Sequence, residues 1–125
     1  MDGSNQENQE QLDSFDATQL SSHNHKHTKG ISSKSLTFDR PFDFPKLRLR
    51  LHVFLTFQSR GLYRMKGILW INDSDEKFVL QSVGTKMSID SLGEWGKDEL
   101  RKNTIVFIGK GLTKEGLEKM LSQCF

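Results

Sequence analysis

The stretch LRLRLHVFLTF, residues 47–57, decides the fold of this chain because its apolar side chains fit two different elements. Every second residue of the stretch is apolar, which is typical of a strand, and locally this pattern fits slightly better. A stripe of helical spacing is also present, made by Phe44, Leu47, Leu51, Phe54, Leu55 and Gln58. Pro45 suits the first turn of a helix and Gly61 can follow its end, and a helix would cover the sheet that later segments predict. We therefore predict a helix over residues 43–58.

Two runs on the C-terminal side of this stretch predict a β-hairpin. LYRMKGILW, residues 62–70, and KFVLQSV, residues 77–83, are rich in aromatic and β-branched side chains, and turn formers separate them. Alternation along the first strand places Arg64 and Lys66 side by side on one sheet face. The opposite face of this strand is expected to carry Tyr63, Met65, Leu69 and Ile71.

Three further segments complete the predicted sheet. Residues 35–39 have the character of a short strand, and the continuous apolar run TIVFIG, residues 104–109, predicts an interior strand buried on both faces. Residues 88–103 are polar and contain two glycines, so we predict a loop around Trp95, with a short strand at residues 86–89.

The final segment predicts a second helix, with Thr113 as its N-cap. The buried stripe of this helix is expected to consist of Leu117, Met120, Leu121 and Cys124. We therefore expect an α+β fold, in which two helices pack on one face of a mostly antiparallel sheet of four or five strands. The expected order is β-α-β-β-β-α.

Residues 1–30 differ in composition from the rest of the chain. They carry mostly polar side chains, and so few apolar ones that burial cannot offset the entropy cost of ordering them. We predict a disordered, His-containing linker over residues 1–30 and one α+β domain over residues 31–125. Cys124 is the only cysteine, and neither a signal peptide nor an apolar run of roughly 20 residues occurs. We interpret this as an intracellular protein, cytoplasmic or in an organelle with a reducing interior, without a membrane partner.

Several segments, taken in order, resemble one known family. They are RPFDFPKLRLRLHVFL, GLYRMKGILW, FVLQSVG, a Trp in the following loop, and NTIVFIGKGLTKEGLEKML. Together, over about residues 35–123, they are similar to the C-terminal domain of the CobW family of metallochaperone GTPases, which handle zinc or cobalt. The resemblance supports the helix over residues 43–58, because this segment is helical in the family.

The resemblance also implies partners. Family members carry an N-terminal P-loop GTPase domain and often a His-rich linker before the C-terminal domain. Neither the P-loop pattern G-x-x-x-x-G-K-[ST] nor the family's Cys-x-Cys-Cys motif occurs in this sequence. We therefore expect no enzyme activity from these residues. Their expected role is that of an accessory domain that contacts a GTPase domain of the family or a client metalloprotein, whether the chain is a fragment or a stand-alone domain.

The candidate metal site consists of His23, His25 and His27. These residues lie where members of the family often have a His-rich linker before the C-terminal domain. Imidazoles at alternate positions lie about 6.5 to 7 Å apart on an extended backbone, so the chain must curl to bring them to one ion. No thiolate or nearby carboxylate offers a fourth ligand. The pattern therefore indicates weak, exchangeable binding of Zn²⁺, Co²⁺ or Ni²⁺, and its alternative is a flexible linker with no metal role.

Arg64, Lys66 and Trp95 are the candidate interaction residues. Two adjacent cations can bind a phosphate, an acidic client or the GTPase domain, whereas their alternative is a solvated strand face. Trp95 is either an interface residue or a ring packed over the sheet edge. Cys124 and His52 fit the core and the helix surface better than a ligand set.

The second functional hypothesis is an α+β module that binds RNA or protein and has no metal role. Sheet platforms bind RNA through exposed aromatic side chains on one face. Here Tyr63 and Trp70 fall on opposite faces by alternation, and no run of five or six basic residues occurs, so a nucleic-acid partner is not expected. No paired carboxylates or nucleophile and base point to an enzyme.

Overall fold

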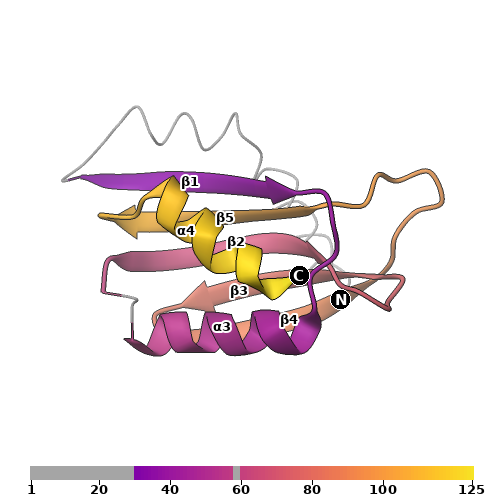
Figure 1. The fold of residues 1–125 in the computed structure, drawn as a ribbon, viewed down its shortest axis with the longest axis horizontal. Helices are drawn as coiled ribbons and strands as arrows, with labels where there is room; N and C mark the ends of the chain where they lie inside the picture. Colours follow the sequence, from indigo (N-terminus) through magenta and orange to yellow (C-terminus); the bar gives the residue numbers. More distant parts are fainter. Residues whose placement is uncertain (1–29, 58–59) are drawn as a thin grey trace, which may run out of the picture.

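A computed structural model describes residues 30–57 and 60–125 of the chain. The described part is an antiparallel sheet with two α-helices on one face, which confirms the predicted α+β fold (Figure 1). Its elements in chain order are β1 (Ile31–Phe38), α3 (Phe44–Phe57), β2 (Leu62–Trp70), β3 (Glu76–Val83), β4 (Lys86–Glu94), β5 (Asn103–Lys110), α4 (Lys114–Leu121) and the 3-10 turn η1 (Ser122–Cys124). No helix of the described residues is long and apolar enough to span a membrane.

The last strand of the chain lies inside the sheet. The strand order is β1-β5-β2-β3-β4, so β5 lies between β1 and β2, and β1 and β4 form the two edges. The register pairs Ile31 with Lys110 at one end of β1 and Gly67 with Ile105 in the centre of the sheet. At Gly67 a Cβ atom would lie 2.4 Å from the Thr104 carbonyl oxygen, so the strands approach too closely for a larger residue. The interior position predicted for residues 104–109 is confirmed.

Residues 47–57, whose apolar pattern fits both a strand and a helix, are helical. In α3 the buried side chains are Leu47, Leu51, Phe54 and Leu55. Leu49, which the strand pattern would have buried, is 65% exposed. The helix begins after Asp43, whose carboxylate oxygen accepts a hydrogen bond from the Lys46 amide at 3.1 Å, so Asp43 acts as an N-cap. The predicted helix over residues 43–58 is confirmed within one residue at each end.

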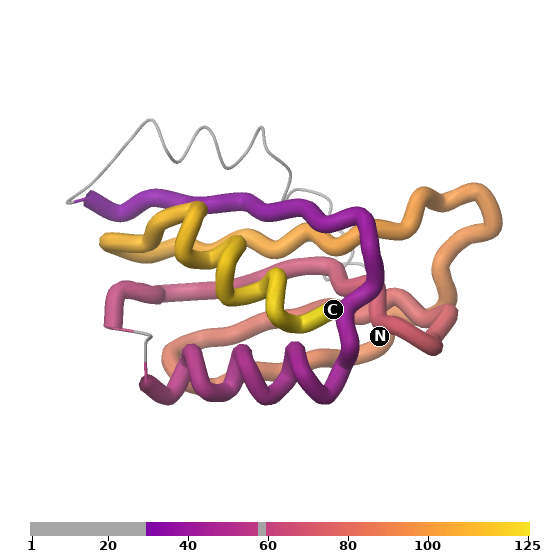
Figure 2. Tube along the Cα trace, in the orientation of Figure 1, coloured from indigo at the N-terminus to yellow at the C-terminus, as the bar shows by residue number. Residues whose placement is uncertain are grey.

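The two helices cover different parts of the same sheet face (Figures 1 and 2). Helix α4 lies over β1, and α3 lies on the side of β3 and β4. The ring of Phe54 on α3 meets Phe107 of β5 edge to face, with ring centroids 6.2 Å apart. Near the chain end, Phe42 stacks on Phe125 at 4.7 Å, and the Asp43 amide donates to the Cys124 carbonyl. These contacts join the start of α3 to the C-terminus.

Three predicted details differ from the structure. Tyr63 does not share the buried face with Met65, because the pairing of β2 with β5 shifts between Leu62 and Arg64. The extra residue of this β-bulge puts Leu62 in the core and leaves Tyr63 46% exposed. The second error concerns the loop predicted after residue 89, because the short strand predicted at residues 86–89 continues as β4 to Glu94. The order of the described elements is therefore β-α-β-β-β-β-α, with one strand more than in the expected order. Strand β1 is also longer than predicted, since it begins at Ile31.

The second helix begins as predicted. Thr113 has an extended backbone conformation, and its hydroxyl oxygen accepts a hydrogen bond from the Gly116 amide at 3.1 Å. Leu117, Leu121 and Cys124 are buried, and Met120 is half-buried against the core. The N-cap and the apolar stripe of α4 are therefore confirmed.

Candidate functional site

The sheet face opposite the helices carries the two predicted cations. Arg64 and Lys66 both belong to β2, the middle strand of the order, and no helix of the described part covers this face (Figure 1). The register places Arg64 between Val83 of β3 and Ile108 of β5. Lys66 lies between Gln81 and Val106 of the same two strands. The predicted adjacency of the two cations on one face is thus present.

The two cations differ in exposure. Arg64 is exposed, whereas Lys66 retains only 3% of its accessible surface. Burial lowers the pKa of the Lys66 ammonium, and the positive charge of nearby Arg64 lowers this pKa further. The charged form of Lys66 is therefore less favourable here than in water, whereas Arg64 keeps its contact with solvent.

An exposed apolar side chain lies beside Arg64. Val83, its partner across the β2–β3 pair and the last residue of β3, is 72% exposed. The site therefore combines one accessible guanidinium with an apolar side chain. Arginine is one of the residue types enriched at protein interfaces.

Trp95 does not join this site. The Trp95 ring is 8% exposed, and the Lys77 ammonium lies 5.1 Å from its centroid. Lys77 also forms an ion pair with Glu99, and the Trp95 amide donates to the Asp75 carbonyl at 3.0 Å. Lys77 is six residues along β3 from Val83, the partner of Arg64, which corresponds to about 20 Å. Trp95 therefore packs at the far end of the sheet from Arg64.

The described residues offer no ready metal site. His23, His25 and His27 lie outside them, and within residues 30–57 and 60–125 no group of three His, Cys, Asp or Glu could hold an ion. Cys124 is 1% exposed, and burial raises the pKa of its thiol, so it acts as a neutral core residue. His52 is exposed on α3, as predicted.

The aromatic side chains considered for RNA binding also lie apart. Tyr63 is the extra residue of the β-bulge near the start of β2. Trp70 ends the same strand and pairs with Lys77 of β3. Seven residues of strand correspond to about 23 Å, so one short run of stacked bases would not reach both rings.

Comparison with known proteins identifies the domain. The family model described as the cobalamin synthesis protein cobW C-terminal domain matches residues 31–125. The zinc chaperone YjiA of Escherichia coli (strain K12) is 34% identical over 85 residues, which cover 68% of this chain and 26% of YjiA. The chain thus spans about a quarter of this curated relative.

Solved structures agree with this match. The crystal structure of Zn(II)-bound YjiA GTPase from E. coli superposes with a TM-score of 0.70 at 30% sequence identity, over 77% of this chain and 30% of that one. A Zn(II)-bound triple mutant of the YjiA GTPase gives the same TM-score of 0.70 over 76% of this chain. The chain therefore belongs to the family of the cobW C-terminal domain.

Proposed function

We propose that this domain is the accessory part of a CobW-like zinc or cobalt metallochaperone, and that it binds a GTPase domain of the same family. The observation that carries the proposal is the exposed Arg64 beside the exposed Val83, on a sheet face that no described helix covers. The family membership supports it, because a relative of which this chain covers only 26% is described as a zinc chaperone and a GTPase.

The chemistry of the face indicates what it would bind. The Arg64 guanidinium favours a carboxylate, which it can contact through two parallel hydrogen bonds. A complementary surface would therefore present an acidic side chain next to an apolar patch that covers Val83. The alternative partner is a client metalloprotein that presents the same combination of an acidic side chain and an apolar patch.

A binding experiment tests this role. A CobW-family GTPase domain produced without its own C-terminal domain is titrated with this chain by calorimetry. We expect the Arg64→Glu variant to bind at least about tenfold more weakly, because the charge beside the partner carboxylate is reversed. Lys119→Glu is the matched control, since Lys119 is exposed on α4 on the helix side and lies outside both candidate surfaces. Equal losses for both variants, or none for Arg64→Glu, would contradict the proposal.

We further propose that His23, His25 and His27 collect a divalent ion for this chaperone. Imidazole nitrogens suit Zn²⁺, Co²⁺ and Ni²⁺, and the lack of a thiolate in the stretch makes the binding weak and exchangeable. Titration of Zn²⁺ into the chain is compared with titration into a His23/His25/His27→Ala variant. We expect uptake of about one ion, lost in the variant. Indistinguishable heats would make the stretch a linker without a metal role.

A further inference from the structure

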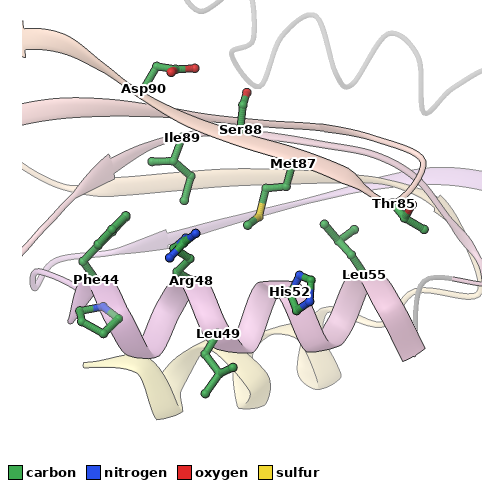
Figure 3. A pocket seen from close by; sticks show the side chains of 11 residues that line it. Phe44, Arg48, Leu49, His52, Leu55, Thr85, Met87, Ser88, Ile89 and Asp90 are labelled. Carbon is green, nitrogen blue, oxygen red and sulfur yellow. The ribbon is translucent and has the colours of Figure 1, made fainter.

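A groove lies on the other side of the molecule, between α3 and β4. It is open, has a volume of about 690 Å³ and is lined by both elements. Figure 3 shows Phe44 and Arg48 of α3 directed toward β4, from which Met87 and Ile89 point toward the helix. His52 also lines the groove, and in this view its ring lies over the near side of α3. The groove lies on the helix-covered side, so it is separate from the face that carries Arg64.

One wall of the groove is the edge of the sheet. Strand β4 pairs with β3 on one side, and no other described strand lies beyond it. An edge strand presents backbone N–H and C=O groups that can pair with an added strand. Between this edge and α3, the side chains of Met87 and Ile89 are half-buried and form an apolar floor with Phe44 and Leu55.

The other wall carries positive charge without compensation. Helix α3 has no acidic residue but contains Lys46, Arg48, Arg50 and His52. Arg50 donates to the Gln123 side-chain oxygen at 2.7 Å, and Lys46 to the Phe125 carbonyl at 3.5 Å. These two basic residues are therefore bound to the C-terminal end of the chain.

Arg48 and His52 have no such partners. Within the described residues neither forms a hydrogen bond or an ion pair, and both line the groove. The groove's one acidic residue, Asp90, does not neutralise them. Its side chain points away from α3 together with Ser88, because alternate residues of β4 face opposite sides (Figure 3). The wall therefore favours an acidic ligand.

The spacing of the two basic residues matches that of a strand. Arg48 and His52 are four residues apart on α3, which corresponds to about 6 Å along the helix axis. Side chains two residues apart on one face of a strand are separated by about 6.7 Å. A strand added beside β4 would thus bring two carboxylates at alternate positions opposite Arg48 and His52.

We propose that this groove binds an extended segment of a partner protein, which adds as a strand to the free edge of β4. The segment carries two acidic residues at alternate positions, flanked by apolar residues on the same face. The carboxylates contact Arg48 and His52, and the apolar side chains cover the floor at Met87 and Ile89. Backbone hydrogen bonds supply affinity, and the two carboxylates supply specificity.

A peptide titration tests this inference. The probe is a fluorescein-labelled peptide, Val-Thr-Glu-Thr-Glu-Thr-Val, which places Val, Glu, Glu and Val on one face of a strand. Anisotropy measures its affinity for the full chain. We expect Arg48→Glu to weaken binding at least about tenfold, the milder Arg48→Gln to weaken it severalfold, and added salt to weaken it further. Circular dichroism checks that both variants remain folded.

Two controls separate this surface and this binding mode from others. Arg64→Glu should bind the peptide as the unmodified chain does, so loss of GTPase-domain binding and loss of peptide binding are distinguishable. A probe with N-methyl groups on alternate backbone nitrogens should bind at least about tenfold more weakly, because it cannot donate to β4. Equal binding of the methylated probe, or of a probe with Lys in place of Glu, would overturn the inference. Self-association of the chain through β4 without peptide binding would also overturn it.

Discussion

The two faces of the sheet are built from the same strands but differ in composition and in exposure. On the helix-covered face, Met65, Leu80 and Phe107 are fully buried. On the opposite face, the neighbouring strand residues include Lys66 and Gln81, and a few apolar residues such as Val106 are buried among them. The comparison teaches that one face carries most of the fold's stability. The other face can then hold an exposed charge such as that of Arg64 at little cost to folding.

The largest expected effect tests this division directly. Phe107→Ala removes a ring that is fully buried and meets Phe54 edge to face. We expect it to lower the free energy of unfolding by about 3–5 kcal/mol, measured by urea denaturation. The control is Arg64→Ala on the opposite face, for which we expect a change within about 0.5 kcal/mol. Similar losses in the free energy of unfolding for the two variants would show that the two faces contribute equally to stability.

A buried polar side chain at one end of the covered face gives the next largest effect. Asn103 is 0% exposed, and its side-chain oxygen accepts a hydrogen bond from the Trp70 amide at 2.6 Å. Its side-chain nitrogen donates to the Arg40 carbonyl at 2.8 Å. Asn103 thus connects the end of β2 to the segment after β1.

We expect Asn103→Ala to lower the free energy of unfolding by about 2 kcal/mol, because a fully buried side chain is truncated and two partly buried hydrogen bonds to the backbone are lost. Hydrogen exchange should show faster exchange of the Trp70 amide, which a general loss of packing would not single out. Asn72→Ala in the exposed turn after β2 is the control, with an expected change near zero. Unchanged exchange at Trp70 would show that this hydrogen bond is dispensable.

The sequence predicts the elements whose signals are local. Pro45 and Gly61 bracket α3, and Thr113 marks the start of α4, so both helices begin where expected. The bulge beside Tyr63 could not be predicted, because simple alternation does not reveal where one strand gains an extra residue. The strand predicted at residues 86–89 is the first half of β4, but its continuation to Glu94 is not evident from the sequence. This is because the exposed residues there are Asp90, Ser91, Gly93 and Glu94, and polar residues and glycine are also common in turns.

Less of the candidate sites can be predicted from the sequence. Alternation is sufficient to place Arg64 and Lys66 on one face. The distance between Arg64 and Trp95 depends on which strand residues pair, and that is a tertiary property. The groove was missed for the same reason. The helical pattern shows that Arg48 and His52 share one side of α3, but not that this side meets the edge of β4.

A smaller effect concerns the helix that covers β1. Thr113→Ala removes the hydroxyl that accepts a hydrogen bond from the Gly116 amide at the start of α4. We expect the free energy of unfolding to fall by about 1 kcal/mol, as is usual for loss of an N-cap. Thr113→Ser retains the hydroxyl and should restore most of this difference in the same urea titration. A Ser variant no better than Ala would show that the methyl group, not the cap, is important.

The smallest expected effect tests whether the charge of Glu99 stabilises the sheet face opposite the helices, where Trp95 packs. The hydrogen bond from Lys77 holds the pKa of Glu99 below its usual 4.5, and the hydrogen bond from the Gly96 amide lowers it further. A carboxyl whose pKa is lower in the folded state stabilises the fold above its unfolded pKa. This stabilisation is lost as the pH falls through the folded value.

We therefore expect Glu99→Gln to be slightly less stable than the unmodified chain at neutral pH. The difference should shrink as the pH falls below 4.5, because the unmodified chain then loses its charge at this site as well. Thermal unfolding of both chains across this range measures it. The effect is small because the pair is solvent-exposed. A difference that persists in acid would mean that Glu99 supports the Trp95 loop through its shape and neutral hydrogen bonds. The stability of the sheet end where Trp95 packs would then come mainly from packing, as it does on the helix-covered face.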